Sequence, residues 1–421
     1  MPPPSSWEFL LIMTQANSQP LSMKKNVVWN TIGSVFYQGC LWLMTVLVVR
    51  LSGDYQNSGS LAFAMSVGNI YTALGTYTMR TYQVADVDDR YSASNYVAIR
   101  LITVLGAIIG CCIYGLIVSP STLTLLTVVS FLLFKADESF VNVLYGCDQK
   151  SLRLDYVGKS QMIRGCVIIA FFIAGMTATH SLPITLALIA GSCFLVTILF
   201  DLKKTSGLVE SLKPHISGAK AFALLRALFP TVLGNVLAGL VTSAARQYFG
   251  IVYGEEALGI YASVATPCVI IQVLAQNLYA PMLGPIAELK LRGKYLEAKK
   301  RAKRLLLLVI GVALSLSAVL ILCSRWFLGL LYGDSILPYI NVLPPALVVT
   351  TGIAALFVIT DLLIVYNKLK QTLVINMVAF AVMIISLVPC TAQWYMNGLN
   401  LSLILGYLSA VVYGLTVLAR E

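Results

Sequence analysis

The sequence predicts an all-α, polytopic membrane protein with about twelve transmembrane helices in two six-helix bundles around a central cavity. Of the 421 residues, 58% are of hydrophobic type and 11% are charged, and the mean hydropathy is +0.84. Apolar runs of about 20 residues, each long enough to cross a hydrocarbon core of about 30 Å, recur from end to end. The runs do not alternate every second residue, which favours helices over a β-barrel. This composition excludes a disordered chain, a disulfide-stapled secreted domain and a soluble enzyme with a membrane tail.

The hydropathy pattern places the spans one after another along the chain. They are expected near residues 27–51, 59–79, 97–118, 122–144, 163–179, 182–200, 224–250, 258–280, 304–323, 340–360, 370–389 and 400–418. Cytoplasmic loops carry an excess of Lys and Arg, so the basic residues test the number of spans. With both termini in the cytoplasm, nearly all of these residues fall in inner segments, and the outer segments hold Arg50, Arg246 and Arg325. The formal net charge of +11 therefore reflects membrane topology and does not indicate nucleic-acid binding.

The chain divides into four parts. Residues 1–22 are polar and Pro-rich and lack the basic start of a signal peptide, so we expect a disordered leader or a true start at Met23. The first bundle is expected over residues 23–200, a cytoplasmic linker over 201–220 and the second bundle over 221–421. A faint repeat supports two related bundles, because a Gly-containing loop precedes similar residues in each half, Gly59-Ser60-Leu61-Ala62 and Gly259-Ile260-Tyr261-Ala262.

The fourth span carries three charged residues. Its apolar run from Leu123 to Phe134 covers only about 18 Å, so the crossing must continue through Lys135, Asp137 and Glu138. Lys135 and Glu138 are three residues apart and share a helix face, whereas Asp137 points elsewhere. One interpretation is an internal ion pair or snorkelling to the interface. The other is a cavity-facing site, in which the lysine attracts an anionic head group and Asp137 and Glu138 carry a coupling proton or sodium ion.

Other polar residues within or beside the spans are further candidates for a substrate-binding cavity. They are Asn30 and Gln38 in the first span, Arg80 at the inner end of the second, Arg246 in the seventh, and Gln276 and Asn277 in the eighth. Hydrogen bonding between helices explains the amides equally well, and snorkelling is the alternative for Arg246. The nine cysteines and two histidines show no metal-ligand spacing, so no cofactor is expected apart from a coupling proton or sodium ion.

A strongly basic inner segment runs from Glu288 to Arg304. It carries eight Lys and Arg residues interleaved with apolar residues. This pattern predicts either simple topological anchoring or an amphipathic helix lying on anionic membrane lipids.

The order of several short motifs resembles bacterial polysaccharide flippases, the O-antigen and capsular repeat-unit translocases of the multidrug/oligosaccharidyl-lipid/polysaccharide exporter superfamily. The resemblance covers residues 23 to 420 approximately, and the leader departs from it. The motifs are Lys-Lys-Asn-x-x-Trp-Asn at Lys24 to Asn30, Gly75-Thr76-Tyr77 followed by Arg80-Thr81-Tyr82-Gln83-Val84-Ala85-Asp86, the charged fourth span ending in Tyr145-Gly146-Cys147-Asp148-Gln149, and Gly259-Ile260-Tyr261-Ala262.

The resemblance implies alternating-access transport of an undecaprenyl-pyrophosphate-linked oligosaccharide across the bacterial inner membrane for O-antigen, capsule or exopolysaccharide synthesis. The family's cationic cavity would be matched here by Lys135, Arg80 and Arg246, because Lys and Arg bind the oxygens of a diphosphate. No catalytic residue is implied. A polysaccharide polymerase and a chain-length regulator would be the protein partners.

Two other functions compete with this interpretation. A cation-coupled drug or small-molecule exporter of the same superfamily would bind its substrate at Asp137 and Glu138, although the cavity candidates are of mixed charge. A membrane-embedded polymerase, ligase or polyprenyl glycosyltransferase would need a sizeable extramembrane loop with catalytic residues, and the outer loops expected here are short. Resistance to cationic dyes would separate the first alternative from a flippase, and so would neighbouring genes for glycosyltransferases.

Overall fold

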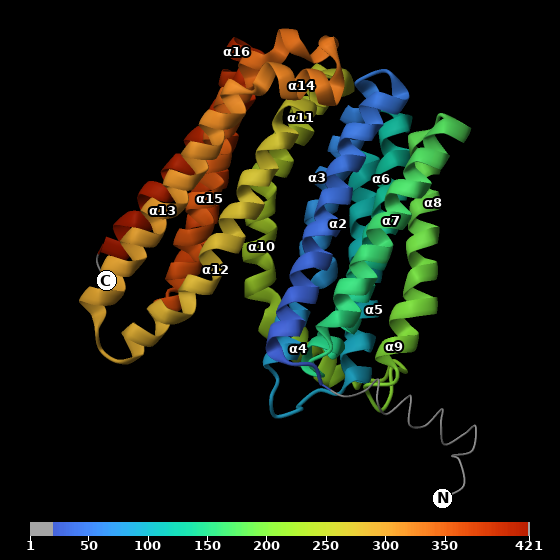
Figure 1. Ribbon diagram of the computed structural model, residues 1–421, viewed down its shortest axis with the longest axis vertical. Coiled ribbons are helices and arrows are strands. Elements are labelled where there is room, and N and C mark those ends of the chain that lie inside the picture. The colour runs from blue at the N-terminus through green and yellow to red at the C-terminus, as the bar shows by residue number, and fades with distance from the viewer. Residues whose placement is uncertain (1–19, 420–421) are drawn as a thin grey trace, which may run out of the picture. The chain divides into compact units, whose positions relative to one another are not determined.

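The computed structural model describes residues 20–419, which form helices joined by short loops, without a strand in this range (Figure 1). The predicted all-α fold class is therefore confirmed. The main elements are, in chain order, α2 (Met23–Ser52), α3 (Gln56–Thr76), α4 (Met79–Ala85), α5 (Ala93–Val118), α6 (Thr122–Lys150), α7 (Leu154–Thr179), α8 (Leu182–Val196), η1 (Thr197–Leu202), α9 (Lys203–Thr205), α10 (Gly218–Tyr253), α11 (Glu255–Ala265), η2 (Thr266–Cys268), α12 (Val269–Leu291), α13 (Tyr295–Leu322), α14 (Ser324–Tyr332), η3 (Asp334–Val342), α15 (Leu343–Val365) and α16 (Leu369–Ala419).

A helical segment corresponds to every predicted span. Between residues 20 and 419, nine helices are long and apolar enough to cross a membrane, and the last of them covers two predicted spans. The two other spans correspond to α3, which is rich in polar residues, and to α6, which carries the charged cluster. The loop expected near residues 390–399 is helical apart from a break at Tyr395, where φ is 51°. The chain is therefore a multi-pass membrane protein.

The described residues form two compact units. Unit 1 comprises the residues up to Leu47 together with Val67–Ile117 and Leu125–Val232, and unit 2 comprises Val48–Ser66, Val118–Thr124 and the residues from Leu233 onward. Five helices therefore contribute residues to both units, namely α2, α3, α6, α10 and, with Val118 alone, α5. The leader prediction falls mainly on residues 1–19, outside the described residues, and the domain boundaries at residues 200 and 221 stay a prediction.

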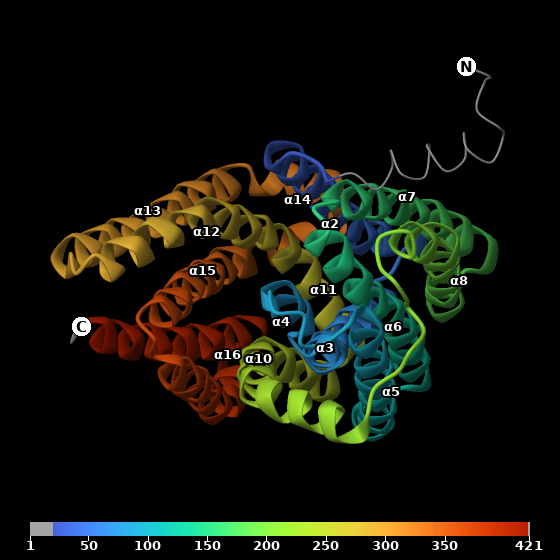
Figure 2. The same cartoon turned by 90° about the horizontal axis from the view of Figure 1, so that it is seen from below.

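Unit 1 is held together by an apolar cluster that positions α4. The cluster joins buried residues of α4, α5, α6, α7 and the start of α10, among them Met79, Tyr96, Val143, Val157 and Leu224. α7 also packs along α8, and both views show the two helices side by side (Figures 1 and 2). Arg80 therefore lies on a short helix whose neighbouring residue Met79 is fully buried.

In unit 2, the starts of α3 and α11 cross closely. Gly53 and Gly254 have positive φ values of 73° and 91° and precede these two helices. A Cβ atom at Gly59 would collide with the backbone of Glu255, and one at Gly259 would collide with the backbone of Tyr55. Glycine is required at both crossing points, and the two pairs of glycines occupy matching positions in the two sequence halves.

The rest of unit 2 contains a second apolar cluster. α12, α13 and α15 run alongside one another and bury residues such as Ala275, Ala302, Leu305, Ala354 and Val358 (Figures 1 and 2). Several of these are alanines, which allow helices to approach closely in lipid.

Candidate functional site

The charged cluster of α6 lies in unit 1. The Nζ atom of Lys135 donates to Oε2 of Glu138 at 2.5 Å, which is the ion pair expected from the three-residue spacing. Tyr37 of α2 donates its hydroxyl to Oε1 of the same glutamate at 3.2 Å. The side chains of Lys135 and Glu138 are only 16% and 29% exposed. Glu138 therefore neutralises Lys135.

Asp137 points away from this pair and contacts a fully buried arginine of α7. Nη1 of Arg164 donates to Oδ2 of Asp137 at 2.5 Å, and Nη2 donates to Oδ2 of Asp201 at 3.0 Å. Thr197 donates its hydroxyl to Oδ1 of Asp137 at 2.6 Å and accepts a hydrogen bond from Arg164. Thr197 and Asp201 belong to η1, a short π-helix, and such segments occur frequently at functional sites.

Two groups of contacting side chains thus lie on and beside α6. The first is the pair of Lys135 and Glu138, and the second is Arg164 with Asp137 and Asp201, so together they hold three carboxylates and two bases. Asp137 and Glu138 are consecutive residues of α6, so the two groups adjoin, and we call them together the α6 network. With every group ionised, the network has one negative charge in excess. A low-dielectric site favours neutrality, so the arrangement can accept one proton or one monovalent cation.

Arg80 lies outside this network. Its Nε and Nη2 atoms donate to Oε1 of Gln149 at 3.1 and 2.9 Å, and its guanidinium carbon lies 5.7 Å from the ring centre of Tyr145. These partners are neutral. The buried carboxylate of Asp148 interacts with Arg80 electrostatically, but no ion pair within 4 Å joins the two among the described residues.

Arg246 of α10 is the corresponding base in unit 2. It is half-buried, its Nε atom is buried without a hydrogen-bond partner, and it has no ion pair within the described part of the chain. The groups with which it interacts electrostatically include the hydroxyls of Tyr261 and Tyr407. Arg246 thus keeps an unpaired charge beside groups that can donate and accept hydrogen bonds.

The predicted amide residues occupy different environments. Asn30 is half-buried, and Gln38 and Gln276 are exposed. Asn277 belongs to α12, but its side chain lies outside the described residues. Their roles in substrate binding stay predictions.

Sequence reasoning missed three charged residues that lie next to these groups or within the spans. Arg164 was counted as a loop base, because the apolar run begins near residue 163, whereas α7 begins at Leu154 and buries it. Asp201 was assigned to the linker, one turn beyond the apolar run. Arg100 is fully buried and donates to the carbonyl of Gly75 at 2.6 Å, near the end of α3, where backbone carbonyls lack helical partners. The available signal was two bases and one acid within or just beyond the ends of apolar runs.

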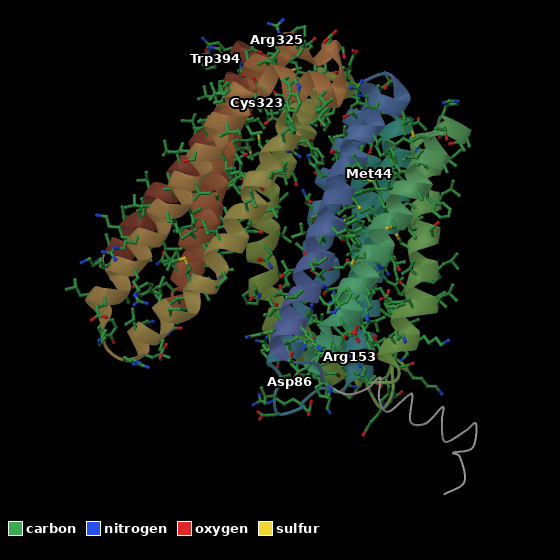
Figure 3. All side chains as sticks on the ribbon, in the orientation of Figure 1. Met44, Asp86, Arg153, Cys323, Arg325 and Trp394 are labelled. Atoms are coloured by element: carbon green, nitrogen blue, oxygen red, sulfur yellow. The ribbon has the colours of Figure 1, made fainter. Side chains whose placement is uncertain are left out.

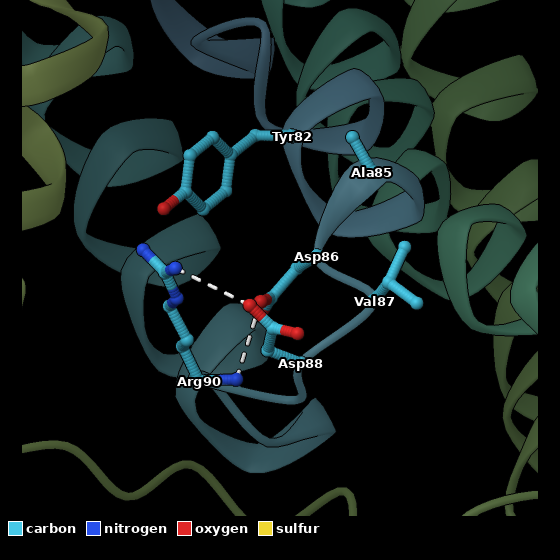
Figure 4. A pocket seen from close by; sticks show the side chains of 6 residues that line it. All are labelled: Tyr82, Ala85, Asp86, Val87, Asp88 and Arg90. Atoms are coloured by element: carbon cyan, nitrogen blue, oxygen red, sulfur yellow. Dashed lines mark hydrogen bonds and ion pairs between the residues drawn. The ribbon is translucent and has the colours of Figure 1, made fainter.

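A pocket of about 340 Å³ lies in the loop between α4 and α5, around Asp86 (Figure 4). Asp86 and Arg153 lie at the same end of unit 1 (Figure 3). Burial raises the pKa of Asp86, but hydrogen bonds from the Tyr96 hydroxyl and from the N–H groups of Tyr91 and Arg90 outweigh this effect. The pKa therefore lies below its ordinary value. These bonds identify Asp86 as the residue that orders the loop.

Comparisons with known proteins give one curated relative and several solved structures. No family model matches the chain. The Staphylococcus aureus capsular polysaccharide biosynthesis protein CapF is 22% identical over 315 residues, which are 74% of this chain and 78% of that protein. The lipid II flippase MurJ, in an inward closed conformation, matches 94% of this chain and 88% of its own, with a TM-score of 0.74 and 11% identity. The chain has the fold of the MurJ and MATE transporters.

Two solved MATE transporters support the likeness to the MATE fold. The Vibrio cholerae MATE transporter VcmN covers 97% of this chain and 98% of its own, with a TM-score of 0.65 and 15% identity. An inward-facing multidrug resistance MATE family transporter of the MOP superfamily covers 94% and 98%, with a TM-score of 0.63 and 13% identity. These proteins establish the architecture, and their low identities leave the substrate open.

Proposed function

We propose that this chain is a flippase that moves undecaprenyl-pyrophosphate-linked oligosaccharide repeat units across the bacterial inner membrane for surface polysaccharide synthesis. Its fold is that of the lipid II flippase MurJ over 94% of the chain. Its curated relative takes part in capsular polysaccharide biosynthesis. Both termini would lie in the cytoplasm, and a polymerase and a chain-length regulator would receive the product.

The observation that carries the proposal is the pair of arginines without a contacting carboxylate. A diphosphate needs cationic donors whose charge is not already neutralised, and Arg guanidinium groups bind such oxygens through paired hydrogen bonds. Arg80 contacts the amide of Gln149 and Arg246 has no described ionic partner, so both can serve. Lys135 is paired with Glu138 and would bind the head group only if that ion pair opened.

Coupling to a proton or sodium ion is the second part of the proposal. The excess carboxylate of the α6 network, shared among Asp137, Glu138 and Asp201, provides the acceptor. Loading this site would change the charge of a network that links α2, α6, α7 and η1. A bound proton or ion can therefore favour one arrangement of these helices over another.

The test is complementation of a strain that lacks the protein. Arg80→Gln and Arg246→Gln are expected to lower transport of the lipid-linked oligosaccharide about 10-fold or more, because each removes a charge-assisted hydrogen bond. Lys135→Ala reports on the third base. Arg325→Gln, an exposed base of α14, is the control and should leave export unchanged. Undiminished surface polysaccharide with both Arg80 and Arg246 replaced would refute a role of these two arginines in transport.

A cation-coupled exporter of drugs or other small molecules is the second candidate. The observation in its favour is the excess of carboxylates around Asp137, together with the MATE fold. Expression in a sensitive host should then raise resistance to cationic dyes without affecting surface polysaccharide. Resistance that disappears in Asp137→Asn would favour this candidate over a flippase.

A further inference from the structure

The turn between α12 and α13 carries a strongly basic surface. Gly293, with φ of 75°, lets the chain reverse between the two helices. Leu291 and Leu296 on either side of it are 87% and 82% exposed. We define the basic face as Leu296, Lys300, Lys303 and Arg304, all exposed on the first three turns of α13.

The acids of this segment do not neutralise the basic face. Glu288 pairs with Arg292 and Glu297 pairs with Lys294, both within one helical turn. In the described range, Lys300, Lys303 and Arg304 have neither an ion pair nor a hydrogen bond from their side chains. Three positive charges therefore remain available to an external anion.

The helix geometry determines what this face meets. Ala298, Ala302 and Leu305 are buried, and at about 100° per residue the basic face lies more than about 120° from the centre of this buried face. The same outward direction continues into Leu307 and Leu314, which are 59% and 55% exposed. In a membrane protein an exposed leucine stripe of this kind meets acyl chains. The basic residues therefore continue the lipid-facing side of α13.

The position along the helix places these charges at the level of lipid head groups. The apolar run from Leu305 to Leu322 spans about 27 Å, close to the thickness of a hydrocarbon core. Lys300 to Arg304 then lie within about 8 Å beyond the core, which is the depth of the phosphates. Leu296, one turn further on, supplies apolar contact to the interfacial layer.

We propose that the basic face of α13 is a binding site for anionic phospholipid head groups. Three bases meet the phosphates, and the leucines above and below them contact the lipid. The charge complementarity and the continuity with the leucine stripe favour a lipid over a soluble acidic protein. The inference does not depend on the transported substrate.

The test uses the full-length protein in bilayer nanodiscs. Lys300→Gln, Lys303→Gln and Arg304→Gln are combined, and the matched control combines Lys203→Gln, Lys213→Gln and Lys220→Gln, which removes three bases elsewhere. Native mass spectrometry counts retained phosphatidylglycerol and phosphatidylcholine, and thermal unfolding compares the two lipids. We expect the wild type and the control to retain phosphatidylglycerol preferentially, and the α13 variant to bind it about 100-fold more weakly.

Three outcomes would overturn the proposal. The first is equal retention of the two lipids by the wild type, and the second is an equal loss in the α13 variant and the control. The third is binding of an acidic soluble protein by the wild type with no preference among the lipids. Because the α13 variant keeps every buried residue of the helix, its unfolding temperature in phosphatidylcholine should match that of the wild type, which separates lipid binding from folding.

Discussion

The two units differ in where their ion pairs lie. In unit 1, Arg164 lies between Asp137 and Asp201, Lys135 pairs with Glu138 and Arg153 pairs with Asp155. In unit 2, the ion pairs among the described residues are the exposed ones near the turn between α12 and α13. Its buried Glu255 accepts hydrogen bonds from Ser121, Thr124 and Gln56 instead.

The backbones of the units differ in a similar way. The described glycines with positive φ, at positions 53, 254, 293 and 333, all belong to unit 2. Unit 1 places five non-glycine residues in this conformation, including the consecutive pair Tyr77 and Thr78, and unit 2 places two, Asn367 and Tyr395. Such residues carry steric strain and persist where the surroundings fix them. Backbone strain of this kind is therefore commoner in unit 1, while each unit offers one base without a contacting carboxylate, Arg80 in unit 1 and Arg246 in unit 2.

The largest effect is expected from Arg164→Met. This change leaves Asp137 and Asp201 buried without their base and should lower the free energy of unfolding by about 3–5 kcal/mol. Arg246→Met is the matched control in unit 2 and should cost much less, because no described carboxylate depends on it. Thermal unfolding in detergent measures both. Equal losses would contradict the difference between the units.

A smaller effect is expected from Glu255→Gln. Glu255 is the first residue of α11, and its partners Gln56, Ser121 and Thr124 lie at the starts of α3 and α6, so positive helix ends surround the carboxylate. Ser121 and Thr124 donate to Oε1 and Gln56 donates to Oε2. Glutamine removes the charge and replaces one of these acceptor oxygens by an amide nitrogen, which should cost about 1–3 kcal/mol. The exposed neighbour Glu256→Gln is the control. A loss no larger than the control's would mean that helix ends do not hold this charge.

The sequence predicted the helical fold and its spans, because hydropathy depends on local composition. The ion pair of Lys135 with Glu138 was one of the two interpretations that the sequence allowed, since both residues share a helix face. The sequence could not predict that Arg164 joins Asp137 to Asp201, because that contact joins three elements and depends on how far α7 extends beyond its apolar residues. The contacts of Glu255 could not be predicted either, because they also join residues of three different elements. Local sequence patterns predict the helices, whereas contacts between helices that are distant in the sequence depend on how those helices pack.

The pH dependence of stability should reveal Asp86 in unit 1. Its pKa is lowered in the folded protein, so the stabilisation is complete above the unfolded pKa of about 3.9 and is lost as the pH falls through the folded value. We expect Asp86→Asn to be less stable than the wild type at neutral pH and to approach it below pH 4. Unfolding midpoints across pH measure this, with the exposed Asp88→Asn as control. A constant difference between wild type and variant would contradict the assignment.

The smallest expected effect has the opposite sign and tests the strained turn before α4. Thr78 has φ of 53°, so Thr78→Gly relieves steric strain and should stabilise the protein by about 0.5–1 kcal/mol, after the entropic cost of glycine is subtracted. Thr76→Gly, two residues earlier in helical α3, should instead destabilise it by up to about 1 kcal/mol. If the strain also orients Arg80, Thr78→Gly should lower export while raising stability. Losses of stability in both variants would mean that unit 1 does not store strain at this turn.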